Sequence, residues 1–199
     1  MKTAFCLDLD GTITREEILP RLAREVDLYD EIRVLTEATL KGVLTFQRSF
    51  ELRCRLLSTI PISRVCEIIE GIDVDSDIES FIHANKQSCF IVTGNLDVWI
   101  EPLTRRLGCA AYTSQAQVVD DRLIGVSSVL DKAAAVHAIR SHFDRVIAVG
   151  DGMNDASMFE AADMGVAFGG VHEPVPALID VSRFVVTDGR ALCRLLSTL

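Results

Sequence analysis

Two aspartates that follow an apolar run are the first residues whose types and spacing suggest chemistry. Asp8 and Asp10 come directly after Thr3–Leu7 and are followed by Gly11 and Thr12. Residues at i and i+2 of an extended strand share a face, so the two carboxylates would repel each other unless the strand breaks there. Such a pair can bind a cation and supply a nucleophile. An Asp-Gly sequence also marks ordinary exposed turns, so this segment alone leaves both interpretations open.

Three segments farther along the chain carry the other groups that phosphoryl transfer needs. Val146–Val149 leads into Gly150-Asp151-Gly152-Met153-Asn154-Asp155, Phe90–Val92 leads into Thr93-Gly94-Asn95, and Lys132 begins a helix of small apolar residues. In a parallel α/β sheet, residues just past the carboxyl ends of the strands meet at one crevice. Carboxylates, a hydroxyl, glycine amides and an ammonium would then lie together, as Mg²⁺-assisted transfer through an aspartyl phosphate requires.

Two of these segments also allow an ordinary structural interpretation. Thr93-Gly94-Asn95 follows the predicted strand Cys89–Val92 and opens a predicted helix, where free amides bind anions but Thr is also a common N-cap. Lys132 in a first helical turn opposes the helix dipole by a few tenths of a kcal/mol, which suggests another use, although most lysines are solvated. The order of the four segments, rather than any one of them, indicates the function.

These residues resemble the haloacid dehalogenase-like hydrolase superfamily, and its phosphoserine phosphatase-like branch in particular. The four motifs of the family correspond to Asp8-Leu9-Asp10-Gly11-Thr12, Thr93-Gly94, Lys132 and Gly150-Asp151-Gly152-Met153-Asn154-Asp155. The resemblance spans nearly the whole chain. It is closest to the phosphoserine phosphatase-like branch, because the insert after the first motif also matches in length and pattern.

The resemblance implies a role for each motif residue. Asp8 is the nucleophile that attacks phosphorus, and Asp10 is the general acid and then the general base. Thr93 and Gly94 bind the phosphate, and Lys132 bridges Asp8 and the phosphate.

The predicted cofactor is Mg²⁺, which prefers one or two carboxylates completed by waters and phosphate oxygens. Its predicted ligands are Asp8, Asp151 and the backbone carbonyl of Asp10. Asp155 is predicted as a supporting carboxylate and Asn154 as a polar contact that binds the substrate.

Substrate choice is expected to depend on the insert. In the predicted helix Thr45–Leu57, Arg53 shares a face with Phe46, Phe50 and Leu57, and a guanidinium on an apolar face needs an anionic partner. An internal salt bridge satisfies this need as well as a ligand does. The resemblance favours a substrate carboxylate as the partner, and it also makes Leu40 and Phe46 pocket-lining positions, although either can be ordinary core.

Glu17 matches the acidic residue of the family that binds the substrate ammonium. Thr14-x-x-Glu17 is also a capping-box pattern, but Pro20 would then fall in the helix interior, where it is costly. A helix that begins near Glu17 is therefore favoured. Relatives often carry Ser-Gly-Gly at the second motif, so Asn95 adds bulk near the pocket.

The pattern of apolar residues predicts the architecture. Strands alternate with helices, which indicates an α/β fold with a doubly wound, Rossmann-like parallel sheet. From Arg15 to about Gly71 only helical periodicity is found, which predicts a small helical cap inserted after the first strand. The expected division is a core of residues 1–14 and 72–199 and a cap of residues 15–71.

Composition limits the possible partners and location. The 199 residues carry a net charge of −9, with a pI near 4.9, which argues against binding to nucleic acid. The six cysteines are scattered without a C-x-x-C pair, and no apolar stretch is long enough to span a membrane. We therefore expect a cytoplasmic monomer or homodimer whose partner is a small phosphate ester. The four histidines show no spacing typical of a metal site.

The sequence thus predicts a Mg²⁺-dependent phosphomonoesterase that acts through an aspartyl phosphate on Asp8. O-phosphoserine, or a similar small ester that bears a carboxylate, is the expected substrate. The alternatives are a phosphotransferase that passes the phosphoryl group from Asp8 to an acceptor alcohol, and a phosphatase for a different small metabolite.

Overall fold

Seven strands form one sheet in the computed structural model, which describes residues 2–199 apart from the side chain of Leu40. The strands are β1 (Thr3–Leu7), β2 (Cys89–Leu96), β3 (Ala110–Val119), β4 (Arg122–Ser128), β5 (Arg145–Gly150), β6 (Met164–Phe168) and β7 (Phe184–Val186). Their order is β4-β3-β2-β1-β5-β6-β7, and every neighbouring pair is parallel except β3 and β4. The predicted doubly wound α/β fold is confirmed, with one antiparallel strand added at an edge.

Helices flank this sheet and fill the segment between its first two strands. They are α1 (Ile18–Arg24), α2 (Tyr29–Leu40), α3 (Phe46–Leu57), α4 (Ile62–Glu70), α5 (Ser76–Ala84), α6 (Asp97–Leu107), α7 (Lys132–Arg140), α8 (Ala156–Ala161), α9 (Pro176–Asp180) and α10 (Gly189–Leu196). A short 3₁₀ turn, η1 (Met153–Asp155), precedes α8. No helix within residues 2–199 is both long and apolar enough to cross a membrane.

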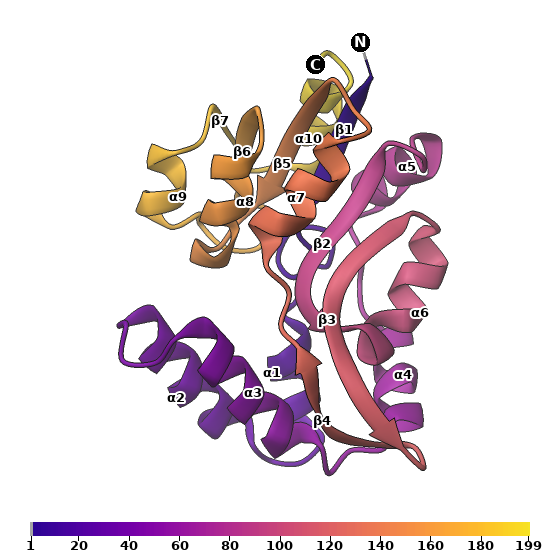
Figure 1. Cartoon of the computed structure of the whole chain (residues 1–199), viewed down its shortest axis with the longest axis vertical. Coiled ribbons are helices and arrows are strands. Elements are labelled where there is room, and N and C mark those ends of the chain that lie inside the picture. Colours follow the sequence, from indigo (N-terminus) through magenta and orange to yellow (C-terminus); the bar gives the residue numbers. More distant parts are fainter. Residues whose placement is uncertain (1) are drawn as a thin grey trace.

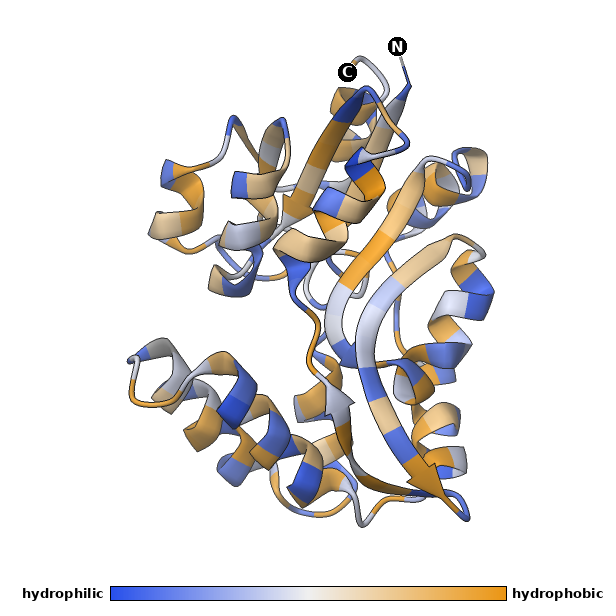
Figure 2. Ribbon diagram, viewed as in Figure 1, coloured by the Kyte–Doolittle hydropathy of each residue, from blue (hydrophilic) through white to orange (hydrophobic). Residues whose placement is uncertain are grey.

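Both faces of the central strands are buried, as expected for parallel strands with helices on each side. Along β1, Ala4 and Cys6 pack with apolar residues of α7, α8 and α9. Phe5 and Leu7 point to the opposite face and pack with apolar residues of α5, α6 and α10. Figure 2 shows β5 mainly in the orange of hydrophobic residues, whereas α2 and α3 carry both blue and orange residues.

Helices α1–α4 lie between β1 and β2 in the chain, where the sequence predicts helices only. In Figure 1, α1, α2 and α3 form the lower left of the molecule, set apart from α7, α8 and α9 above them. Helix α4 packs against α6 as well as against α1. The division into a core of residues 1–14 and 72–199 and a cap of residues 15–71 remains a prediction.

The second strand is longer than the sequence predicts. The expected strand ends at Val92, and Thr93-Gly94-Asn95 is expected to open a helix over Leu96–Leu107. The helix is confirmed as α6, which begins at Asp97, but β2 continues through these three residues to Leu96. The extra residues are held by β3, since Leu96 pairs with Ser114 after a register shift and the Ser114 hydroxyl donates to the Gly94 carbonyl at 2.7 Å. Neither a helix N-terminus nor an N-cap is therefore present at Thr93.

The sequence predicts short strands over residues 110–126 with a turn at Asp120-Asp121; the turn is confirmed, and the two strands are longer and form one hairpin over residues 110–128. Asp120 and Asp121 make its turn with φ angles of 46° and 64°, a left-handed conformation that Asp tolerates better than most residues. Asp121 also accepts hydrogen bonds from the backbone N–H groups of Ile62 and Ser63, at 2.9 and 2.8 Å. The hairpin is thereby tied to the start of α4.

Candidate active site

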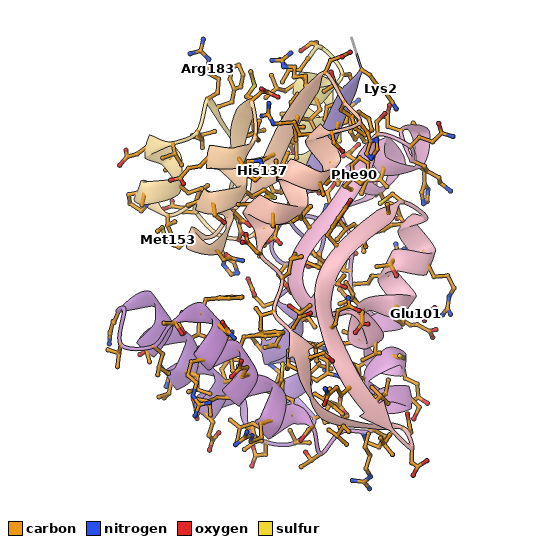
Figure 3. The ribbon with its side chains drawn as sticks, viewed as in Figure 1. Lys2, Phe90, Glu101, His137, Met153 and Arg183 are labelled. Carbon is orange, nitrogen blue, oxygen red and sulfur yellow. The ribbon has the colours of Figure 1, made fainter. Side chains whose placement is uncertain are left out.

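The carboxyl ends of β1, β2 and β5 open into one pocket of about 710 Å³ that helices of the insert also line. Eight of the ten predicted site residues line it: Asp8, Asp10, Glu17, Arg53, Thr93, Gly94, Asp151 and Asn154. The other two, Lys132 and Asp155, lie buried behind Asp8. In Figure 3, Met153, which also lines the pocket, lies on the side of the α/β part that faces α2 and α3.

Lys132 lies between two buried carboxylates. Its Nζ donates to Oδ1 of Asp8 and to Oδ1 of Asp155, both at 2.6 Å, and all three side chains are at most 5% exposed. Asp131 fixes the start of α7 by accepting hydrogen bonds from the amides of Ala133 and Ala134. Lys132 is therefore not a solvated surface lysine, and the unfavourable dipole position is offset by direct ion pairing.

Asp155 positions the loop that follows β5. Its Oδ2 accepts hydrogen bonds from the backbone amides of Asp151 and Gly152, both at 3.0 Å, while its Oδ1 pairs with Lys132. Gly150 lies so close to this carboxylate that a Cβ there would be 2.4 Å from Cγ of Asp155. Both oxygens of Asp155 are thus used by the protein, in keeping with a supporting role.

The loop after β1 meets the loop after β5 at Gly11. This residue has a φ of 68°, and a Cβ on it would lie 2.4 Å from Oδ2 of Asp151. Only glycine fits both the left-handed backbone and the close approach of the two loops. The contact brings the Asp10-Gly11 backbone against the Asp151 carboxylate.

Negative charge exceeds positive charge at the bottom of the pocket. Burial and the neighbouring Asp155 raise the pKa of Asp8, although Lys132 opposes this shift. Burial, Asp155 and Asp10 raise the pKa of Asp151 to about 7. Burial opposes the charge of Lys132, but the carboxylates of Asp155 and Asp8 together raise its pKa. One ammonium does not balance this many carboxylates, so the site favours a further cation.

The donor set fits a hard divalent cation. Asp8, Asp151 and Asp155 each offer a carboxylate oxygen, and these three atoms lie within 4.8 Å of one another. Carboxylate oxygens are the ligands that Mg²⁺ and Ca²⁺ prefer. Because Asp155 is occupied by Lys132 and two amides, Asp8 and Asp151 are the carboxylates of this group that remain best able to bind the cation.

Asp10 is held by two hydrogen-bond donors. Its Oδ1 accepts from the backbone N–H of Ile18 at 2.8 Å, and its Oδ2 accepts from Nδ2 of Asn95. Burial raises the pKa of Asp10, and both hydrogen bonds counteract that shift. The sequence predicts only added bulk at Asn95. The structure shows a buried side chain that bonds to both Asp10 and Thr93.

Glu17 lies at the pocket wall, at the start of the insert. It is the N-cap residue of α1, which places Pro20 in the first turn, as the sequence favours. The capping box is not formed, because the Thr14 hydroxyl donates to the carbonyls of Leu9 and Glu16 instead. Burial and the nearby carboxylates of Asp10 and Asp151 raise the pKa of Glu17 to about 8.

Arg53 faces the same pocket from α3. Its guanidinium donates long hydrogen bonds to the Ser49 carbonyl at 3.4 Å and to the Thr36 hydroxyl at 3.5 Å. Within residues 2–199 no carboxylate lies within 4.0 Å of it, so the alternative of an internal salt bridge is not realised. Burial lowers its pKa, while Glu17 and Asp10 counteract this. The half-buried charge thus has room for an anionic ligand.

Phe46 joins the insert to the second motif. A Cβ on Gly94 would lie 2.9 Å from Cζ of the Phe46 ring, so the glycine allows α3 to approach β2 closely. Phe46 stacks on Phe50 with ring centroids 5.9 Å apart, and both line the pocket. The side chain of Leu40, the other position that the resemblance selects, lies outside the described residues.

Among the titratable residues that line the pocket, one has no predicted role. His172, in the loop after β6, lies with Nε2 3.9 Å from Oε1 of Glu17 and lines the pocket. The spacing of the four histidines gives no sign of a role for this residue, because it does not resemble that of a metal site. The signal that could have indicated His172 is its position in the loop after the carboxyl end of the parallel strand β6.

Comparison with known proteins identifies the relatives of this arrangement. A family model described as haloacid dehalogenase-like hydrolase matches residues 2–163. The chain is 29% identical over 182 residues to the phosphoserine phosphatase of Methanocaldococcus jannaschii, an alignment that covers 84% of this chain and 85% of that protein. It is also 29% identical over 180 residues to the phosphoserine phosphatase of Archaeoglobus fulgidus, covering 84% of this chain but 52% of the relative. The chain thus spans about half the length of this second relative.

Solved structures of similar proteins share the whole architecture. A phospho-aspartyl intermediate analogue of phosphoserine phosphatase has a TM-score of 0.83 and 26% identity, with 98% of each chain covered. A substrate-bound phosphoserine phosphatase complex has a TM-score of 0.81 and 25% identity, and covers 100% of this chain and 98% of the other.

Proposed function

The chain belongs to the haloacid dehalogenase-like hydrolase family, and we propose that it hydrolyses O-phosphoserine or a similar small, carboxylate-bearing phosphate monoester. The observation that carries this proposal is the buried arrangement of Asp8, Lys132 and Asp155 at the bottom of a pocket that Arg53 and Glu17 also line. The similarity to phosphoserine phosphatases over most of the chain supports the substrate class.

The proposed reaction has two steps on one carboxylate. An Asp8 oxygen forms a bond to phosphorus as the bond to the ester oxygen breaks, and Asp10 gives its proton to that oxygen. Water then attacks the aspartyl phosphate, Asp10 takes a proton from the water, and the bond between phosphorus and Asp8 breaks. Lys132 holds the nucleophile in place through its 2.6 Å contact and offsets negative charge on the transferred group.

Asp8, Asp151 and the backbone carbonyl of Asp10 are the proposed ligands of Mg²⁺, which would offset the phosphate charge when bound. Thr93, Gly94 and Asn154 are proposed to contact the phosphate. The close approach of Gly94 to Phe46 keeps that side of the pocket narrow.

The insert is proposed to select the substrate. Arg53, which has no carboxylate partner within residues 2–199, is proposed to bind the substrate carboxylate, and Glu17 is proposed to bind the substrate ammonium. We propose that residues 15–71 act as this specificity cap on a core of residues 1–14 and 72–199. All six cysteines are free thiols, which supports the proposed cytoplasmic location.

A phosphate-release assay over a panel of small phosphomonoesters tests the proposal. We expect O-phosphoserine to be hydrolysed with the highest kcat/KM, and Asp8→Asn to abolish release while the protein stays folded. Asp180→Asn, at an exposed position of α9, is the matched control and should retain full activity. Full turnover by Asp8→Asn would refute the covalent mechanism. Phosphate transfer to added alcohols without free phosphate would indicate a phosphotransferase instead.

A further inference from the structure

His172 faces Glu17 across the pocket. The two residues come from opposite sides: Glu17 begins the insert, whereas His172 lies in the loop between β6 and α9. Nε2 of His172 lies 3.9 Å from Oε1 of Glu17, and the side chains are 58% and 43% exposed. Both atoms are therefore accessible to a ligand in the pocket.

The loop that carries His172 is folded against the end of the sheet. The Gly169 amide donates to the Val186 carbonyl at 2.8 Å, and a Cβ on Gly169 would lie 3.0 Å from Cδ of Pro174. A Cβ on Gly170 would lie 2.4 Å from the ring of Phe168. The hydrogen bond ties Gly169 to β7, and neither glycine position has room for a side chain. The imidazole is thus presented at the edge of the sheet where Asp8 and Asp151 also lie.

The separation of the two atoms suits a shared donor better than a direct bond. At 3.9 Å they are too far apart for a hydrogen bond to each other. A nitrogen placed about 2.9 Å from both would see them at an angle of about 85°, which keeps two of its N–H bonds within about 30° of linear. A primary ammonium has three such N–H bonds, and a neutral imidazole offers one lone pair to accept one of them.

We propose that His172 is a second acceptor for the primary ammonium group of the substrate, beside Glu17. This inference rests on the proposed function, because it assigns a second residue to the amine end of the same ester. The bound ammonium favours the ionised form of Glu17, which lies opposite it, and His172 supplies a second acceptor that fixes the direction of the amine. The pair selects for N–H donors, so a quaternary ammonium such as that of phosphocholine is excluded from the shared contact.

Steady-state kinetics on four esters test the proposal. O-phosphoserine and O-phosphoethanolamine carry a primary ammonium, phosphoglycolate has none, and phosphocholine has a quaternary nitrogen without N–H groups. We expect His172→Ala to raise KM about fivefold to tenfold for the two primary amines and to leave kcat unchanged. KM for phosphoglycolate and phosphocholine should stay constant. His172→Gln, whose amide oxygen can accept a hydrogen bond, should restore part of the loss. His142→Ala is the matched control at an exposed histidine outside the pocket.

Other outcomes would overturn the proposal. A lower KM for O-phosphoserine in His172→Ala would show that a charged imidazole competes with the substrate for Glu17. An equal rise in KM for phosphoglycolate would show that the loop only supports the pocket. If wild-type protein hydrolyses phosphoglycolate as well as O-phosphoserine, no ammonium site is present, although the phosphatase function stands.

If none of the esters is hydrolysed, the proposed function itself fails. Calorimetric titration with O-phosphoserine and phosphoglycolate then measures the ammonium subsite by itself. Tighter binding of O-phosphoserine that is lost in His172→Ala supports the subsite, and equal binding of the two esters overturns it.

Discussion

Replacing Arg53 with alanine should separate recognition of the substrate carboxylate from the chemistry at Asp8. Arg53 lines the pocket, but its two hydrogen bonds are long, at 3.4 and 3.5 Å. Burial lowers its pKa, which means that the folded protein only partly compensates its charge. An arginine held in this way contributes little to folding, so we expect its removal to leave the thermal midpoint within about 2 °C of the wild type.

The expected loss in activity follows from the interaction that alanine removes. A hydrogen bond to a charged group contributes about 1.5–3 kcal/mol, which corresponds to a loss of about tenfold to 150-fold in kcat/KM. This loss should apply to O-phosphoserine, whose carboxylate would meet the guanidinium. For O-phosphoethanolamine and for an aryl phosphate, neither of which has a carboxylate, the loss should be below about threefold. Arg53→Lys should recover part of the difference, because it keeps the charge without the paired donors.

The assay is phosphate release at varied substrate concentration, together with thermal unfolding of each variant. Arg55→Ala is the matched control, since Arg55 lies two residues away on α3 and is exposed. Equal losses on esters with and without a carboxylate, together with a lower thermal midpoint, would show that Arg53 is structural. That result would leave Asp8 as the nucleophile but would remove the reason to expect an amino-acid phosphate.

Four further measurements address the rest of the site. Lys132→Met should reduce kcat at least 100-fold and lower the midpoint in circular-dichroism melting, because it leaves two buried carboxylates without their cation. Asn95→Ala should reduce kcat about tenfold with little change in KM in steady-state assays, since it removes a donor to Asp10 rather than a substrate contact. Exhaustive chelation should abolish phosphate release, and Mg²⁺ should restore it better than Ca²⁺, whose larger shell can engage both oxygens of the nucleophile. The pKa of Glu17 is raised above its ordinary value of 4.5, so metal-free protein should lose stability as pH rises above that value. Glu17→Gln should therefore raise the melting midpoint more at pH 8 than at pH 5, by a small amount because solvent screens a side chain that is 43% exposed.

The central sheet could be predicted because its sequence signal is local. Thr3–Leu7 and Arg145–Gly150 each contain an uninterrupted apolar run, which is followed by Asp8 in the first case and by Gly150 in the second. Such runs are typical of strands that are buried on both faces. The helical periodicity of residues 15–71 likewise predicts an insert without strands. The turn between β3 and β4 also has a local signal in Asp120-Asp121, whereas the length of the two strands and the place of β4 at the sheet edge do not.

The length of β2 could not be predicted for a physical reason. Thr93, Gly94 and Asn95 have the composition of a turn, and strand propensity alone ends the element before them. Their extended conformation depends on β3, whose Ser114 bonds to the Gly94 carbonyl from 20 positions away. Pairing with a distant strand therefore overrides the local preference, and it places Asn95 beside Asp10.

Asn95 and His172 also show which kind of site residue a motif-based prediction misses. Their partners, Asp10 and Glu17, lie far away in the chain, so no spacing rule connects them. Both nevertheless follow or end a parallel strand at the edge where the motif residues gather. The rule that located Asp8 and Asp151 applies equally to every parallel strand of the sheet, including β6. Polar residues at each of these strand ends are therefore candidates for substrate recognition, even when no motif contains them.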